Sequence, residues 1–73
     1  MLTVEEFIRM AADRGAKLEI LELRSRRILT NGRVGYPLNQ KMDDLLADDV
    51  RDSMCRLFGL PYLDFALDDR LED

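Results

Sequence analysis

The sequence predicts a small α+β domain of the order α-β-β-β-α, in which helices pack against a three-stranded antiparallel sheet. Three observations lead to this prediction. A helix-capping signal opens the chain, an Asn31-Gly32 turn signal separates two short β-prone runs, and two glycines stand where amphipathic segments end. At 73 residues the chain is long enough for one domain, with a core over about residues 3–60 and a C-terminal helical extension over 61–73.

The first helix is expected over residues 4–14. Thr3 and Glu6 have the spacing of a capping box, in which each side chain bonds to the backbone N–H of the other residue. Leu2 and Phe7 have the spacing of a hydrophobic staple across the same helix start. The stripe expected to face inward consists of Phe7, Ile8, Ala11 and Ala12.

The first strand is predicted over residues 17–23, after Gly15, which can take the left-handed conformation that ends a helix. Apolar and charged residues alternate at first, as in a half-buried strand, and then Leu21 and Leu23 continue the apolar pattern on the opposite face. Two explanations stay open: a β-bulge, or a strand covered on both faces. A helix is the competing interpretation, and the glycine before the segment and the hairpin after it favour the strand.

The hairpin that follows is predicted from Asn31-Gly32, a pair that suits a type I′ turn because that turn needs positive φ at both central residues. The flanking β-prone residues are Ile28 and Thr30 on one side and Val34 and Tyr36 on the other. Pro37 is expected to close the last strand, because proline lacks the N–H that a ladder needs.

The last third is predicted to be helical, with a break in the acidic run. In one continuous helix Asp44, Asp48 and Asp52 would repel one another at i, i+4 and i+8. If Asp48 or Asp49 caps a new helix instead, the acids lie at its positive end and stabilise it. The apolar stripe of that helix would be Val50, Met54, Leu57 and Phe58, ending at Gly59. In the extension, the residues expected to dock on the domain are Tyr62, Leu63 and Phe65.

Composition excludes several kinds of site. The chain has no histidine, which rules out histidine-based catalytic triads, dyads and zinc sites, and we expect no enzyme. The single cysteine, Cys55, is interpreted as a packing residue and allows no intrachain disulfide. No leader peptide or membrane span is recognisable, so a cytoplasmic protein is expected. The Asp pairs lack the spacing of a chelating loop, and neither a metal nor a cofactor is expected.

Charge is divided unevenly along the chain. Residues 1–42 carry eight basic and five acidic side chains, a net +3, whereas residues 43–73 carry three basic and ten acidic ones, a net −7, which gives the total of −4. The candidate binding residues are Arg24, Arg26, Arg27, Arg33 and Tyr36. Arginines can grip phosphates, but one nearby aromatic residue is few for base stacking. They could equally pair with the acidic half, within the chain or across a homodimer.

The motif order resembles the HicA-type mRNA interferase family, which has a double-stranded-RNA-binding-like fold. The residues that carry the resemblance are Phe7, Ile8 and Gly15, Arg24-Ser25-Arg26, Tyr36-Pro37-Leu38, Asp44-Leu45 and Gly59-Leu60. The resemblance implies a catalytic histidine near the position of Arg26. Arginine stays protonated at neutral pH and cannot act as a general base, so the resemblance implies a catalytically silent member or a fold cousin.

Three functions follow from these observations. The leading hypothesis is a small, non-enzymatic protein-interaction module that binds a protein partner or itself, as a homodimer. The apolar residues after Pro61, namely Tyr62, Leu63, Phe65 and Leu67, are the expected dimer contact. The second hypothesis is an RNA-binding or ribonuclease-like protein of toxin–antitoxin type. The third is an acidic mimic of nucleic acid, based on the run from Asp43 to Asp52.

Overall fold

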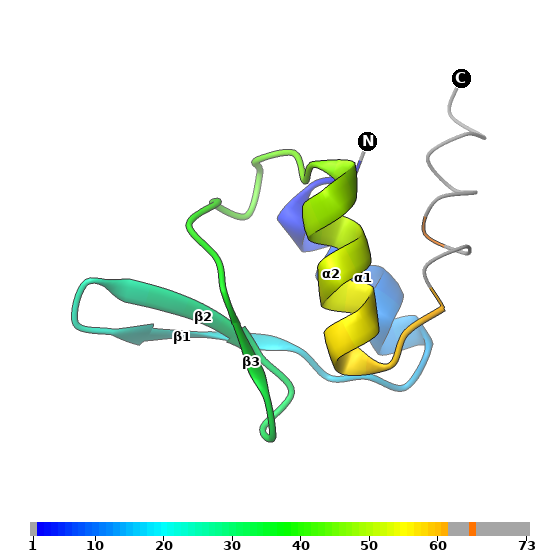
Figure 1. The fold of residues 1–73 in the computed structure, drawn as a ribbon, viewed down its shortest axis with the longest axis horizontal. Coiled ribbons are helices and arrows are strands. Elements are labelled where there is room, and N and C mark those ends of the chain that lie inside the picture. The colour runs from blue at the N-terminus through cyan, green and yellow to red at the C-terminus, as the bar shows by residue number, and fades with distance from the viewer. Residues whose placement is uncertain (1, 62–64, 66–73) are drawn as a thin grey trace.

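The structure, a computed structural model, describes residues 2–61 and residue 65. Its elements are α1 (Val4–Asp13), β1 (Glu19–Leu23), β2 (Arg26–Thr30), β3 (Gly35–Pro37) and α2 (Asp48–Phe58). The strands form one antiparallel sheet in the order β1-β2-β3, which confirms the predicted α-β-β-β-α domain. Both helices lie at one end of the sheet, and the β1–β2 hairpin extends away from them (Figure 1). The predicted extension lies outside the described residues, except for Pro61 and Phe65.

The start of α1 is fully hydrogen-bonded, and the predicted capping box is present. Glu6 N–H donates to Thr3 Oγ1 at 3.1 Å, and Thr3 N–H donates to Glu6 Oε1 at 2.9 Å. The N–H groups of Val4 and Glu5 donate to backbone carbonyls of the segment that precedes α2, at 3.1 and 2.9 Å, and Phe7 N–H donates to the Thr3 carbonyl at 3.0 Å. The first four helical N–H groups therefore all have partners, and the chain between β3 and α2 is fastened to α1.

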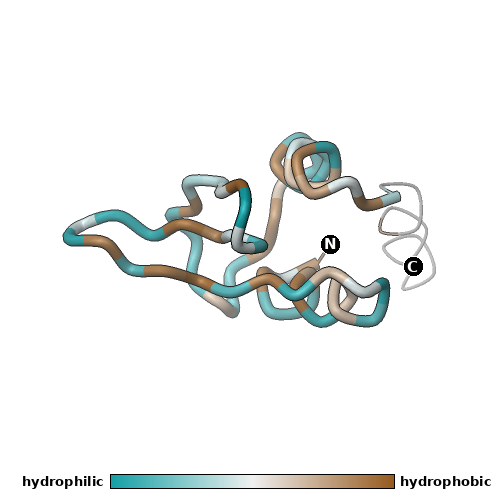
Figure 2. The backbone as a smooth tube through the Cα atoms, turned by 90° about the horizontal axis from the view of Figure 1, so that it is seen from below, coloured by the Kyte–Doolittle hydropathy of each residue, from teal (hydrophilic) through white to brown (hydrophobic). Residues whose placement is uncertain are grey.

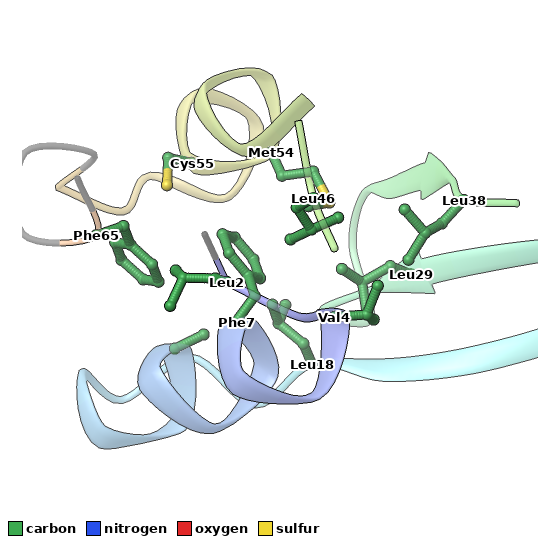
Figure 3. Packing of buried hydrophobic residues seen from close by; sticks show 11 residues of the cluster. Leu2, Val4, Phe7, Leu18, Leu29, Leu38, Leu46, Met54, Cys55 and Phe65 are labelled. Atoms are coloured by element: carbon green, nitrogen blue, oxygen red, sulfur yellow. The ribbon is translucent and has the colours of Figure 1, made fainter. Parts of the chain in front are cut away.

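The core lies where the two helices meet the base of the sheet (Figure 3). Its buried members are Leu2, Val4, Phe7, Ala11, Leu18, Leu29, Leu38, Leu46, Met54, Cys55 and Phe65. Leu2 and Phe7 are both buried, in agreement with the predicted staple. Ala12 was expected to face inward but is exposed, because the buried stripe of α1 is centred on Val4, Phe7 and Ala11.

Neither of the two expected explanations accounts for the change of apolar face along β1. The ladder with β2 runs without interruption from the pair Glu19 and Thr30 to the pair Leu23 and Arg26, so there is no bulge. Leu21 and Leu23 are 43% and 56% exposed, so the strand is not covered on both faces either. They lie on the sheet face opposite Leu29, which is fully buried.

Two turns connect the strands, and the predicted type I′ turn is not one of them. The β2–β3 loop has four residues, 31–34, because Thr30 pairs with Gly35. Gly32 has positive φ, at +95°, but Asn31 does not; instead its Oδ1 accepts the N–H groups of Arg33 and Val34, at 2.9 and 3.0 Å. The asparagine side chain thus accepts the backbone N–H groups of the loop, and a two-residue turn is not formed.

The other turn, Arg24-Ser25, joins β1 to β2. Arg24 has a φ of +57° and is the only non-glycine residue with positive φ in the described chain. Positive φ at the first central position alone is the pattern of a type II′ turn, which suits a two-residue hairpin. The three predicted strands therefore form a meander of two hairpins, with the tighter turn at an arginine.

The helix α2 begins at Asp48, so the predicted break in the acidic run is confirmed. The N-cap residue is Ala47, which has no side-chain cap, so neither Asp48 nor Asp49 caps the helix; both lie in its first turn. Gly59 ends the helix with a φ of +71°, as predicted. Leu57 was expected in the inward stripe but is 40% exposed.

Candidate functional site

The four predicted arginines do not form one cluster. Arg24 lies in the β1–β2 turn and Arg26 opens β2 beside it, whereas Arg33 lies in the loop beyond the other end of β2. A five-residue strand separates them, a span of about 13 Å at roughly 3.3 Å per residue. Only Arg24 and Arg26 remain as neighbours that one ligand could contact together, and two arginines make a small phosphate-binding site.

Arg27 has a structural role on the opposite face of β2. Its Nη1 donates to the Gln40 carbonyl at 2.8 Å, and its Nε lies 3.7 Å from Glu22 Oε1 on the neighbouring strand. The side chain is only 26% exposed, and Nε itself is buried without a hydrogen bond among the described residues. Arg27 thereby connects β1, β2 and the segment after β3, and its guanidinium already has partners within the domain.

Tyr36 is also placed away from the arginines at the hairpin tip. It pairs with Leu29 in the ladder and packs against the core. Its side chain lines a shallow hollow of about 450 Å³ together with Ser53 and Leu57 of α2. Tyr36 therefore contributes to the contact between sheet and helix and offers no stacking platform next to Arg24 and Arg26.

The structure also shows a candidate binding surface that the sequence did not predict. It is the sheet face turned away from the core, here called the outer face. Its residues are Glu19, Leu21 and Leu23 of β1, Arg26, Ile28 and Thr30 of β2, and Gly35 and Pro37 of β3. Leu21, Ile28 and Pro37 follow one another in a row across the three strands. The tube in Figure 2 shows hydrophobic positions along both strands of the hairpin, in the part that extends away from the helices.

The middle of the outer face is closely packed. A Cβ atom added to Gly35 would lie 2.6 Å from Ile28 Cγ2, so the isoleucine side chain lies directly over the glycine. Ile28 is consequently half-buried, whereas its ladder neighbour Leu21 remains 43% exposed. The shift in the apolar alternation of β1 is the sequence signal for this face, although the two explanations expected from it were a β-bulge and a strand covered on both faces.

Cys55 lies in the core, where the sequence placed it. Burial raises the pKa of its thiol to about 11, and the nearby Asp52 carboxylate acts in the same direction. The thiol is therefore protonated at neutral pH, which is the unreactive form. A hollow of about 500 Å³ lies beside it, lined by Asp52, Cys55, Arg56, Gly59 and Leu60. Within the described residues no three His, Cys, Asp or Glu side chains gather as metal ligands would.

Arg51 is a buried charge that sequence reasoning missed. It lies on α2 within 3.2 Å of both Asp48 Oδ1 and Asp52 Oδ1, with the side chain almost fully enclosed. In the acidic segment, Asp44 Oδ2 also accepts the Lys41 N–H at 2.8 Å. Part of the acidic run is thus occupied by contacts within the domain, and the run presents less free charge than the sequence suggested.

Comparison of the chain with protein-family models, with curated proteins and with solved structures finds no match. Of what the resemblance to the HicA-type family implies, the structure shows the α-β-β-β-α order and a three-stranded antiparallel sheet in this chain. None of the helices in the described part of the chain is long and apolar enough to cross a bilayer.

Proposed function

We propose that this protein is a small, non-enzymatic protein-interaction module that binds through the outer face of its β1–β2 hairpin. One observation carries the proposal: Leu21 and Leu23 are 43% and 56% exposed on a sheet face that neither helix covers. Full burial of a leucine side chain is worth about 1.5–3 kcal/mol relative to exposure. A partner that covers this face gains the part of that energy that corresponds to the area still exposed, and the hairpin presents both side chains on the same face.

The dispersal of the arginines favours a protein partner over RNA. Arg27 is used inside the domain, and Arg33 lies beyond the far end of β2 from Arg24 and Arg26. The remaining pair borders an apolar face, which suits a protein interface better than a polyanion. Arginine is also enriched in protein interfaces, so Arg26 fits the edge of such a contact. In a catalytically silent protein of HicA type, Arg26 would take the place of the catalytic histidine on this same hairpin.

A photo-crosslinking amino acid at position 21 tests the proposal in the cells that produce the protein. Position 57 is the matched control, because Leu57 is also an exposed leucine, at 40%, and lies on α2. We expect discrete protein adducts from position 21 that are absent from position 57 and that survive nuclease digestion. Adducts that disappear on ribonuclease treatment would favour the RNA-binding alternative, and equal labelling from both positions would contradict the proposed face.

A further inference from the structure

The outer edge of β1 has backbone hydrogen-bonding groups that β2 does not use. Leu38 N–H donates to the Arg27 carbonyl, so the backbone groups of Arg27 point toward β3. Because these directions alternate along an antiparallel strand, Arg26 and Ile28 bond toward β1, to their ladder partners Leu23 and Leu21. The N–H and C=O groups of the alternate residues of β1, Ile20 and Glu22, therefore point away from the sheet.

The two edges of the sheet differ in how open they are. The edge strand β3 has three residues and ends at Pro37, and both features discourage the addition of another strand. The edge strand β1 has five residues, with neither proline nor glycine. It belongs to the hairpin that extends away from the helices (Figure 1). β1 is therefore the edge at which the sheet can grow.

We infer that β1 pairs with β1 of a second copy of this chain, antiparallel and with Leu21 on the two-fold axis. This inference rests on the proposed function and names its partner. In this register the outward-pointing backbone groups of Ile20 meet those of the partner's Glu22, and the symmetric pair does the same. Four backbone hydrogen bonds form, and the two sheets join into one of six strands.

Charges on the outer face select this register. Glu19 lies opposite the partner's Leu23, and the partner's Arg26 is the next residue in that row. Two strand spacings, about 9.6 Å, separate the Cα atoms of Glu19 and the partner's Arg26, and their long side chains can meet over the intervening leucine. Each copy supplies one acid and one arginine, so the symmetric dimer has two such pairs.

Neighbouring registers lack this complementarity. A shift that places Glu22 on the axis sets two carboxylates directly opposite each other, which is unfavourable. The opposite shift places Ile20 on the axis and sets Leu21 against the partner's Glu19, which breaks up the apolar row. With Leu21 on the axis, the row across the joined sheet contains Pro37, Ile28 and Leu21 of each copy without interruption. Apolar contact and charge pairing thus favour the same register, the one with Leu21 on the two-fold axis.

Cysteine substitution in the purified full-length chain tests the register. In a non-hydrogen-bonded antiparallel pair the Cα atoms are about 4.5 Å apart, within the range that a disulfide spans. We expect Leu21→Cys to form a covalent dimer rapidly under a mild oxidant. Leu23→Cys is the control on the same strand and face, because Leu23 and the partner's Leu23 are four residues out of register, about 13 Å. The native thiol of Cys55 is buried and does not compete. Equal crosslinking of both variants, or of neither, would overturn the inference.

Charge pairing at position 21 provides a second measurement that needs no disulfide. Leu21→Lys and Leu21→Glu each place like charges on the axis, so each variant alone should sediment as a monomer, whereas an equimolar mixture should dimerise. Leu57→Lys should dimerise as the unaltered chain does. A chain that stays monomeric at millimolar concentration, and yet gives protein adducts from position 21 in cells, would refute the homodimer and leave the proposed function intact. A chain that stays monomeric and also gives no protein adducts from position 21 would refute both the homodimer and the proposed function.

Discussion

Leu21 lies directly opposite Ile28 in the β1–β2 ladder, on a sheet face that neither α1 nor α2 covers. The two residues differ in exposure because Ile28 leans over Gly35 on β3, whereas β1 is the edge strand of the described sheet. The side chain that the sheet leaves open is thus the one at its free edge. The packing of the sheet thus leaves Leu21 exposed at the edge where we propose that a partner binds.

Gly35→Ala should destabilise the domain, because the added methyl group would collide with Ile28 Cγ2 at 2.6 Å. The γ-methyl belongs to a stiff, β-branched side chain, so relief requires a rotamer change or a strand shift. We expect a loss of about 1–3 kcal/mol in the free energy of unfolding, measured by urea denaturation. In the background of Ile28→Ala the same change should cost much less. An unchanged cost there would mean that the collision is not the cause.

Arg27→Lys should also be destabilising, because lysine cannot reproduce the guanidinium bond to the Gln40 carbonyl together with the pairing to Glu22. A loss of about 1–2 kcal/mol is expected, near the lower end of the range of about 1.5–3 kcal/mol for a hydrogen bond to a charged group. Arg26→Lys is the matched control on the exposed face and should stay within about 0.5 kcal/mol. Similar unfolding free energies for the two variants would contradict the structural role of Arg27.

Arg24→Asn should stabilise the hairpin. Arginine at a φ of +57° adopts a sparsely populated conformation that costs a non-glycine residue about 1–3 kcal/mol, whereas asparagine is one of the residues that dominate type II′ turns. We expect a gain of about 0.5–1 kcal/mol and a higher melting temperature. Ser25→Asn, at the other turn position, should give no such gain. If Arg24→Asn is destabilising, the arginine must make a contact that offsets its backbone strain.

The sequence predicted the elements whose signals are local. The capping box at Thr3 and Glu6 fixed the start of α1, and Gly59 fixed the end of α2. It did not predict which face of β1 is covered, because that depends on where the helices pack, and a run of leucines is compatible with either answer. The turn at Asn31 was assigned wrongly because asparagine can supply either positive φ or a side-chain acceptor, and the ladder register decides between them.

The expected site was less predictable than the fold, because where each side chain lies depends on strand register and packing and not on local sequence signals. Arg26 and Arg27 are adjacent in sequence, but strand alternation sends one to the outer face and the other to Gln40. Phe65 was predicted both to dock on the domain and to contribute to a dimer contact. It is fully buried, with its ring 4.9 Å from that of Phe7, which confirms the docking and removes Phe65 from the dimer contact. The other residues of that contact, Tyr62, Leu63 and Leu67, lie outside the described residues.

Cys55 should be unreactive in the native protein and should make stability depend on alkaline pH. Because burial raises the pKa of its thiol from about 9 to about 11, the folded state holds the proton more tightly than the unfolded state does. The stabilisation from this site is complete below pH 9 and is lost as the pH rises from about 9 to about 11. Iodoacetamide at pH 8 should therefore label the native thiol far more slowly than it labels the thiol in urea. Cys55→Ala removes the titrating group, so the stability advantage of the unaltered chain over this variant should narrow across that pH range. Rapid native labelling, or a constant advantage up to pH 11, would show that the thiol is accessible.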